Sequence, residues 1–274
     1  MPDIQLIAMD MDGTLLNSQQ QISSGNAAAL REARAQGIRL AICSGRSPGD
    51  LALFALENDL ADCALLSLNG TYCYDRPGGN LVSDHVFSEK TAQEIIRILW
   101  ESGIEFGCFS RNQVVVFRDD DGKNDGAWAT HREGKEAPVL LHGWTGMEQI
   151  RRDCVNKVVC YTADKDKLAE VYEQLSLLEE VDITSSWSNN FEMMPAGANK
   201  GTAVAELAAS LGLDASQVMT LGDHDNDISM IAWAGMGVAM ENATAGVRQT
   251  AKFVTLTNNE DGVAYAIRRY ALKK

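Results

Sequence analysis

An apolar run that ends in two aspartates constrains this chain more than any other feature. Residues 4–9 read IQLIAM and are followed by Asp10, Met11, Asp12 and Gly13. The run predicts a buried strand, and carboxylates at the end of a buried strand are costly unless another group pairs with them. Side chains alternate along a strand, so Asp10 and Asp12 would share one side. Two such acids can share a cation and divide the roles of nucleophile and acid/base.

The composition limits the partners that the chain can have. Its 274 residues are 45% hydrophobic and carry a formal net charge of −14 at pH 7, which allows a sizeable core and one or two domains. This negative charge argues against binding to nucleic acid or to an anionic membrane surface. The sequence shows neither a signal peptide nor an apolar run that could span a bilayer, and its six cysteines form no C-x-x-C pair. We therefore expect a cytoplasmic protein whose thiols are reduced and mostly buried.

Strands and helices alternate in the first and last thirds of the chain. We expect buried strands at residues 4–10, 38–44, 63–68, 218–221, 237–240 and 253–256, with helices between them. This order predicts an α/β fold built on a doubly wound, mostly parallel Rossmann-like sheet with helices on both faces.

The middle of the chain has a different pattern, because several strands follow one another. They are expected at residues 105–109, 114–118, 155–162, 183–187 and 191–194, with helices at 89–101 and 166–177. Consecutive strands predict an antiparallel sheet with helices on one face. We therefore expect a core domain of residues 1–85 and 193–274, and an inserted α+β domain of residues 86–192.

Polar residues follow the predicted core strands at the edge where ligands bind in open parallel sheets. The second strand leads to Ser44 and Gly45, the third to Asn69 and Gly70, and the fourth to the segment 222–227, GDHDND. Lys200 begins the helix before the fourth strand. The set combines oxygen ligands suited to Mg²⁺ with a hydroxyl and a cation, which favours phosphoryl transfer through an aspartyl-phosphate.

Four motifs in this order resemble those of the haloacid dehalogenase superfamily. They are DMDGTL from Asp10, SGR from Ser44, Lys200, and GDHDND from Gly222. The insert lies between the second and the third motif, as it does in Cof-type phosphatases with a large α/β (type IIB) cap. The resemblance covers the whole chain and implies that residues 86–192 form a cap domain.

The resemblance also implies a role for each motif residue. Asp10 would be the nucleophile and Asp12 the general acid/base, and Mg²⁺ would be bound by Asp10, the main-chain carbonyl of Asp12, and Asp223. The phosphate would be contacted by Met11, Ser44, Gly45, Lys200 and Asn226, and Asp227 would orient Lys200 or a metal-bound water. The expected function is a Mg²⁺-dependent phosphatase for small phosphorylated metabolites, with sugar phosphates favoured.

Alternatives remain open at the level of function and of single residues. A sugar phosphomutase of the same superfamily would isomerise its substrate rather than release phosphate, and a catalytically idle regulatory or binding protein would do neither. Ser44 alone would be an ordinary helix cap, and Asp227 would be a first-turn acid of its helix. Asn69-Gly70 would be either a simple turn or a contact to the substrate. Within the insert, we expect residues 119–146, with Trp128 and Trp144, to discriminate among substrates.

Overall fold

The computed structural model describes residues 3–111, 113–117, 139–141, 154–185 and 189–273. The chain divides into two compact units, which we call the core unit (Met1–Asp84 with Ala198–Lys274) and the inserted unit (His85–Gly197). Each is described by itself. Apart from 139–141, the stretch 119–146 that we expect to contact the substrate lies outside the described residues, as do Trp128 and Trp144. The assignment of the insert as a cap stays a prediction.

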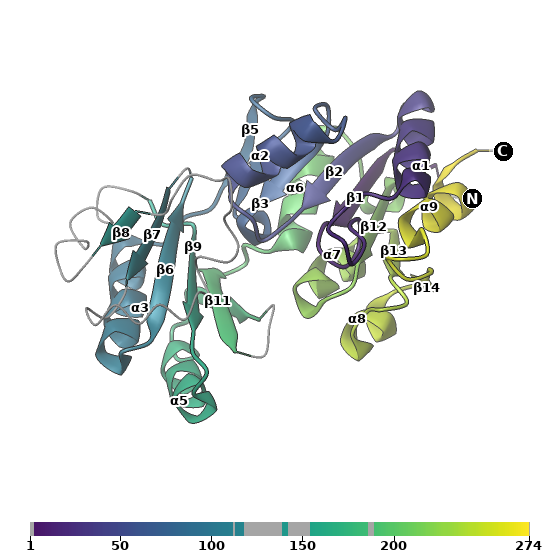
Figure 1. The fold of residues 1–274 in the computed structure, drawn as a ribbon. Coiled ribbons are helices and arrows are strands. Elements are labelled where there is room, and N and C mark those ends of the chain that lie inside the picture. Colours follow the sequence, from purple (N-terminus) through teal and green to yellow (C-terminus); the bar gives the residue numbers. More distant parts are fainter. Residues whose placement is uncertain (1–2, 112, 118–138, 142–153, 186–188, 274) are drawn as a thin grey trace. The chain divides into compact units, whose positions relative to one another are not determined.

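The core unit is built on an eight-stranded sheet of order β14-β13-β12-β1-β2-β3-β4-β5 (Figure 1). Its strands are β1 (Leu6–Asp10), β2 (Arg39–Cys43), β3 (Ala64–Ser67), β4 (Tyr72–Tyr74), β5 (Leu81–Asp84), β12 (Val218–Gly222), β13 (Met236–Ala239) and β14 (Phe253–Val254). All neighbours from β14 to β3 pair in parallel, which confirms the predicted mostly parallel sheet. β1, wholly buried, lies between β2 and β12.

The edge hairpin β4–β5 was not predicted from the sequence. β4 pairs in antiparallel fashion with β3 on one side and with β5 on the other. The turn between β4 and β5 contains Pro77, Gly78 and Gly79. The short alternating segment at 72–74 followed by these turn residues is the signal that would have indicated it.

Helices cover both faces of the core sheet, as expected. They are α1 (Ser24–Ala35), α2 (Pro48–Glu57), α6 (Lys200–Ser210), α7 (Ile228–Trp233), α8 (Ala245–Thr250) and α9 (Gly262–Ala266). In Figure 1, α1 and α2 lie on one side of the sheet and α7 and α8 on the other. α2 begins with Ser47 as its N-cap, whose Oγ accepts a hydrogen bond from the Asp50 amide at 3.2 Å. The alternative that Ser44 caps this helix is therefore wrong.

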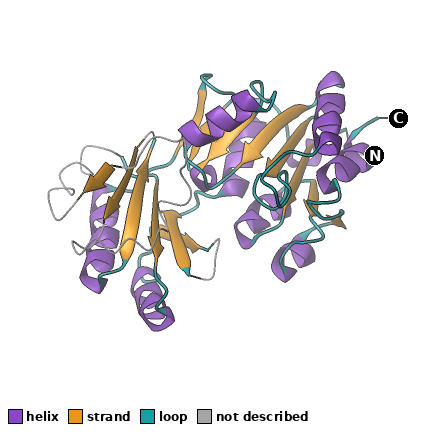
Figure 2. Cartoon of the chain, viewed as in Figure 1, coloured by secondary structure: helices purple, strands orange, loops and turns teal. Residues whose placement is uncertain are grey.

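Within its described residues, the inserted unit has a six-stranded sheet of order β10-β11-β9-β6-β7-β8, on which helices α3 and α5 pack (Figure 2). Its elements are α3 (Glu89–Ser102), β6 (Glu105–Ser110), β7 (Gln113–Phe117), β8 (Val139–Leu141), β9 (Lys157–Tyr161), α5 (Lys165–Leu175), β10 (Val181–Thr184) and β11 (Asn190–Pro195). Ile95, Leu99 and Leu175 of the helices share a buried cluster with Phe106 and Phe117 of the sheet. This confirms an α+β arrangement with helices on one face.

One strand pair in this sheet departs from the expected antiparallel pattern. β7 and β8 are parallel, whereas the other described pairs are antiparallel. Parallel neighbours need a long connection, and β7 and β8 are well separated along the chain. Among the described residues, the helices include none with the length and apolar character needed to cross a membrane.

Candidate active site

β1 delivers Asp10 to the carboxyl end of the core sheet, where the ends of β2 and β12 lie beside it. The Asp10 side chain is almost hidden from solvent, with the residue 8% exposed. Met11 is fully buried, and its side chain belongs to the hydrophobic core. Gly13 then turns with φ at +88°, and an added Cβ would collide with the Asp223 carboxylate. The turn after β1 therefore needs a glycine where it passes the segment that follows β12.

Lys200 is the cation that pairs with Asp10. It is the first residue of α6 and is only 1% exposed. Its Nζ donates to Asp10 Oδ1 at 2.6 Å and to Asp227 Oδ1 at 2.7 Å. Burial lowers the pKa of the Lys200 ammonium, but the two carboxylates outweigh this and raise it above its usual range. Lys200 is therefore held as a cation between two acids from distant segments.

Asp227 connects this ion pair to the loop after β12. Its Oδ2 accepts hydrogen bonds from the main-chain amides of Asp223 at 2.9 Å and His224 at 3.1 Å, and the residue is completely buried. Asp227 thus fixes both Lys200 and the loop that carries Asp223. The alternative of a merely structural first-turn acid does not account for its contact with Lys200.

Asp223 stands beside Asp10 and Asp227 in a group that has the composition of a metal site. One carboxylate oxygen from each of the three lies within 4.8 Å of the others. Burial raises the pKa of Asp223 to about 6. A hydrogen bond of 2.7 Å from Thr14 Oγ1 to Asp223 Oδ1 lowers the same pKa but does not offset the effect of burial. Burial likewise raises the pKa of Asp10 well above its usual range, while Lys200 opposes the shift. Crowded carboxylates desolvated in this way fit a hard divalent cation such as Mg²⁺, because it would offset both their burial and their repulsion.

Asp12 is oriented by an arginine to which no role was assigned from the sequence. Arg46 donates from Nη2 to Asp12 Oδ1 at 2.7 Å and from Nε to Asp12 Oδ2 at 3.1 Å. Its Nη2 also donates to Gln20 Oε1 at 3.2 Å. The Asp12 side chain is 46% exposed, unlike that of Asp10. The two motif carboxylates therefore differ, one being buried against a lysine and the other half-exposed on an arginine.

The predicted phosphate contacts Ser44 and Asn226 meet at a turn after β3. Ser44 is buried, and its carbonyl accepts a hydrogen bond from the Asn69 amide at 2.9 Å. Asn226 donates from Nδ2 to Asn69 Oδ1 at 3.4 Å. Gly45 follows Ser44 at the same sheet edge and is partly exposed.

The structure therefore brings all the predicted site residues to one end of the core sheet. Sequence reasoning assigned no role to two residues that hold them there, Thr14 and Arg46, and it named Asn69 without its contact to Asn226. Thr14 lies in the motif DMDGTL and Arg46 in the motif SGR. Their position inside these motifs is the signal that could have indicated a role in the site. The Asn69 contact joins residues far apart in sequence, so only the fold reveals it.

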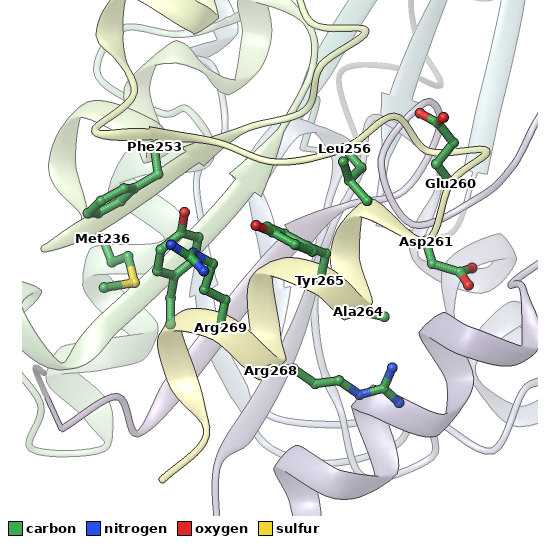
Figure 3. Close-up of a pocket in the computed structure, with 10 residues that line it drawn as sticks. Met236, Phe253, Leu256, Glu260, Asp261, Ala264, Tyr265, Arg268 and Arg269 are labelled. Carbon is green, nitrogen blue, oxygen red and sulfur yellow. The ribbon is translucent and has the colours of Figure 1, made fainter. Parts of the chain in front are cut away.

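A cavity lies elsewhere in the core unit, between β14 and α9 (Figure 3). It has a volume of about 730 Å³, and Phe253, Tyr265 and Arg269 are among the residues that line it. None of its lining residues belongs to the predicted site. The chemistry of phosphoryl transfer is therefore assigned to the carboxylate cluster and not to this cavity.

Comparison with known proteins shows the family of this chain. Residues 7–267 match the family of haloacid dehalogenase-like hydrolases. The chain belongs to that family. It is 36% identical to a 5-amino-6-(5-phospho-D-ribitylamino)uracil phosphatase of Bacillus subtilis, over 98% of this chain and 97% of the relative.

Solved structures show the same fold. A haloacid dehalogenase-like hydrolase of Bacillus subtilis superposes with a TM-score of 0.85 at 28% identity, covering 97% of this chain and 100% of the other. A sugar phosphatase of haloacid dehalogenase subclass IIB gives a TM-score of 0.82 at 20% identity, over 97% and 98% of the two chains. The predicted membership of the Cof-type group is confirmed by the family match and by the 36% identical relative. The chain is thus a haloacid dehalogenase-family phosphatase of small phosphorylated metabolites, and the alternative of an idle binding protein is set aside.

Proposed function

We propose that this phosphatase hydrolyses phosphate monoesters of sugars and sugar alcohols through an aspartyl-phosphate formed on Asp10, with Mg²⁺ as cofactor. The observation that carries the proposal is the placement of Asp10. Its Oδ1 accepts the hydrogen bond from Lys200, whereas Asp10 Oδ2 has no hydrogen-bond partner among the described residues. One oxygen is thus held in place and the other is available to attack.

The proposed reaction has two steps at one phosphorus atom. Asp10 Oδ2 attacks phosphorus in line, and the bond from phosphorus to the ester oxygen breaks. Asp12 gives a proton to that leaving oxygen. Water then attacks the same phosphorus while Asp12 takes a proton from it, and inorganic phosphate leaves Asp10.

The remaining residues supply positive charge and orientation. Lys200 neutralises part of the phosphate charge while it holds Asp10. Mg²⁺, when bound by Asp10, Asp223 and the main-chain carbonyl of Asp12, would neutralise the remaining charge on the phosphate oxygens. Asp12 has both oxygens on Arg46 in this structure, so its proton transfer requires that pair to open.

The substrate class is inferred from chemistry and from the relative. The 36% identical phosphatase is named for a substrate whose phosphate sits on a ribityl chain, a primary alkyl phosphate. An alkyl alcohol is a poor leaving group and needs an acid at its oxygen, which is the role proposed for Asp12. Sugar and sugar-alcohol phosphates meet that description.

The test is a panel of metabolite phosphates assayed for inorganic phosphate, with Mg²⁺ and with EDTA. We expect release from ribityl, sugar or related phosphates that depends on Mg²⁺. Full activity in EDTA would contradict the metal site. Isomerised sugar phosphate without free phosphate would instead support the mutase alternative.

A further inference from the structure

The turn after β3 holds two adjacent residues in a conformation that L-amino acids rarely adopt. Leu68 has φ +51° and Asn69 has φ +60°, and both are buried. A residue other than glycine is strained in this conformation. Glycine would take this conformation freely, and Gly70 does so with φ +92°. Asparagine adopts this conformation more readily than most other residues, and a further reason for its presence lies in its contacts.

The contacts of Asn69 supply that reason. Its main-chain amide donates to the carbonyl of Ser44 at 2.9 Å, and the amide of Leu68 donates to the carbonyl of Arg46 at 3.0 Å. Its side-chain Oδ1 accepts from Asn226 Nδ2 at 3.4 Å. One residue thus touches both segments from which the predicted phosphate contacts Ser44 and Asn226 come.

The side-chain contact restricts the Asn226 carboxamide. A carboxamide has two N–H donors on one side and an accepting oxygen on the other, and a flip exchanges them. Asn69 Oδ1 accepts from one Nδ2 hydrogen, which fixes the nitrogen side. The second hydrogen is then available to an anion, and no other hydrogen bond of the Asn226 side chain is found among the described residues.

We propose that Asn69 is a positioning residue of the phosphate site, which orients the Asn226 carboxamide as a donor while its main chain holds Ser44. The inference rests on the proposed function, in which Ser44 and Asn226 contact the phosphate. Asn69 itself need not touch the substrate. The strain at Leu68 and Asn69 is the cost of bringing this side chain between the two segments.

The experiment measures how inorganic phosphate binds to the Mg²⁺-loaded protein, by calorimetry and as a competitive inhibitor. Asn69→Gly keeps the main-chain amide, accepts the left-handed φ and removes the contact with Asn226. We expect phosphate affinity to fall roughly 3- to 10-fold, the equivalent of one hydrogen bond, with an unfolding temperature no lower than that of the wild type. Asn69→Ser, which is too short to reach Asn226, is the second variant if the glycine form does not fold.

Asp59→Gly is the matched control. Asp59 also has a left-handed φ, of +58°, but lies in an exposed turn that contacts none of the predicted site residues. This change relieves the same kind of backbone strain away from the site and should leave phosphate affinity unchanged. An equal loss in Asp59→Gly would assign the effect to the backbone and overturn the proposal.

A double-mutant cycle tests whether Asn69 acts through Asn226. In an Asn226→Ala background, Asn69→Gly should cause no further loss of phosphate affinity, because the group that it positions is gone. Additive losses, or wild-type affinity in the Asn69→Gly single variant, would overturn the inference.

The outcomes separate this inference from the proposed function. If the wild type hydrolyses esters but Asn69→Gly binds phosphate normally, only the inference fails. If the wild type binds phosphate, shows the predicted coupling and hydrolyses no ester, only the proposed function fails. A wild type that binds no phosphate contradicts both.

Discussion

Lys200 donates from Nζ to Asp10 Oδ1 at 2.6 Å, in a part of the core where both side chains are shielded from water. The same Nζ lies 2.7 Å from Asp227. Three charges from three segments of the chain, β1, α6 and the loop after β12, thus form one buried group. A buried group of this kind is more costly to break than to replace, because removal of one member leaves the others without a partner.

Lys200→Met should therefore destabilise the metal-free protein. Methionine fills a similar volume but leaves Asp10 and Asp227 buried without their cation, and we expect the free energy of unfolding to fall by about 3–5 kcal/mol. Urea unfolding in EDTA measures it. Lys273→Met is the control, because the Lys273–Asp3 pair is exposed at the surface and should contribute nothing measurable. Equal effects of the two changes would contradict the importance of the buried group.

Magnesium should stabilise the protein more at neutral than at acidic pH. Burial raises the pKa of Asp223 to about 6, above its ordinary 3.8. In metal-free protein, the stability that a raised pKa contributes is present at low pH and is lost as the pH rises through about 6. Mg²⁺ binding has the opposite dependence, because the metal needs ionised carboxylates.

The measurement is the shift in unfolding temperature on adding Mg²⁺. We expect a clear increase at about pH 7.5 and little or none at about pH 5. Asp223→Asn, which cannot titrate, should show a small shift at both pH values. An equal shift at both pH values in the wild type would exclude Asp223 as a metal ligand.

Asp12→Asn should distinguish substrates by their leaving groups. An amide cannot donate the proton that an alkyl alcohol needs, so hydrolysis of an alkyl phosphate should slow by roughly 10²–10⁴. The first step with an activated aryl phosphate should suffer far less, because its leaving group is stable without a proton. Steady-state and burst kinetics on the two esters provide the comparison, and equal losses in the first step would remove Asp12 from the acid role.

The cysteines provide a test of the fold that does not depend on catalysis. Cys43, Cys63, Cys73, Cys108 and Cys160 are buried, and Cys154 is exposed. Burial raises the pKa of both Cys63 and Cys73 to about 12, so these thiols should not react while the protein is folded. A thiol reagent should modify one cysteine in the native protein and all six after denaturation. Rapid reaction of a second thiol in the native state would contradict the packing of the core.

The hydrophobic pattern sufficed to predict the parallel strands and their helices, because buried strands read as continuous apolar runs. The ends of those strands then predicted where Asp10 and Asp223 would meet, and the order of the motifs added Lys200. The hairpin β4–β5 was missed because its strands are short and lie at the sheet edge, where apolar runs are weak. The pairing of β7 with β8 depends on tertiary contacts that no local pattern specifies.

Pairwise contacts inside the site were the least predictable part. The resemblance implied a role for Asp12, but nothing in the sequence indicated that Arg46 would bind both of its carboxylate oxygens. The contact of Asn69 with Asn226 spans 157 residues. From the sequence, a simple turn and a contact to the substrate were equally good interpretations of Asn69-Gly70. The catalytic roles themselves stay predictions.

The most direct test of the central claim is to trap the phosphorylated enzyme. Asp12→Asn, mixed with an activated aryl phosphate and Mg²⁺, should form the aspartyl-phosphate quickly and hydrolyse it slowly, because no base activates the water. Acid quenching followed by peptide mass spectrometry should then find one added phosphoryl group on Asp10, and none when Asp10→Asn is combined with Asp12→Asn. Turnover of the ester by wild-type protein, with no phosphoryl group on Asp10 in the quenched Asp12→Asn enzyme, would contradict the covalent mechanism.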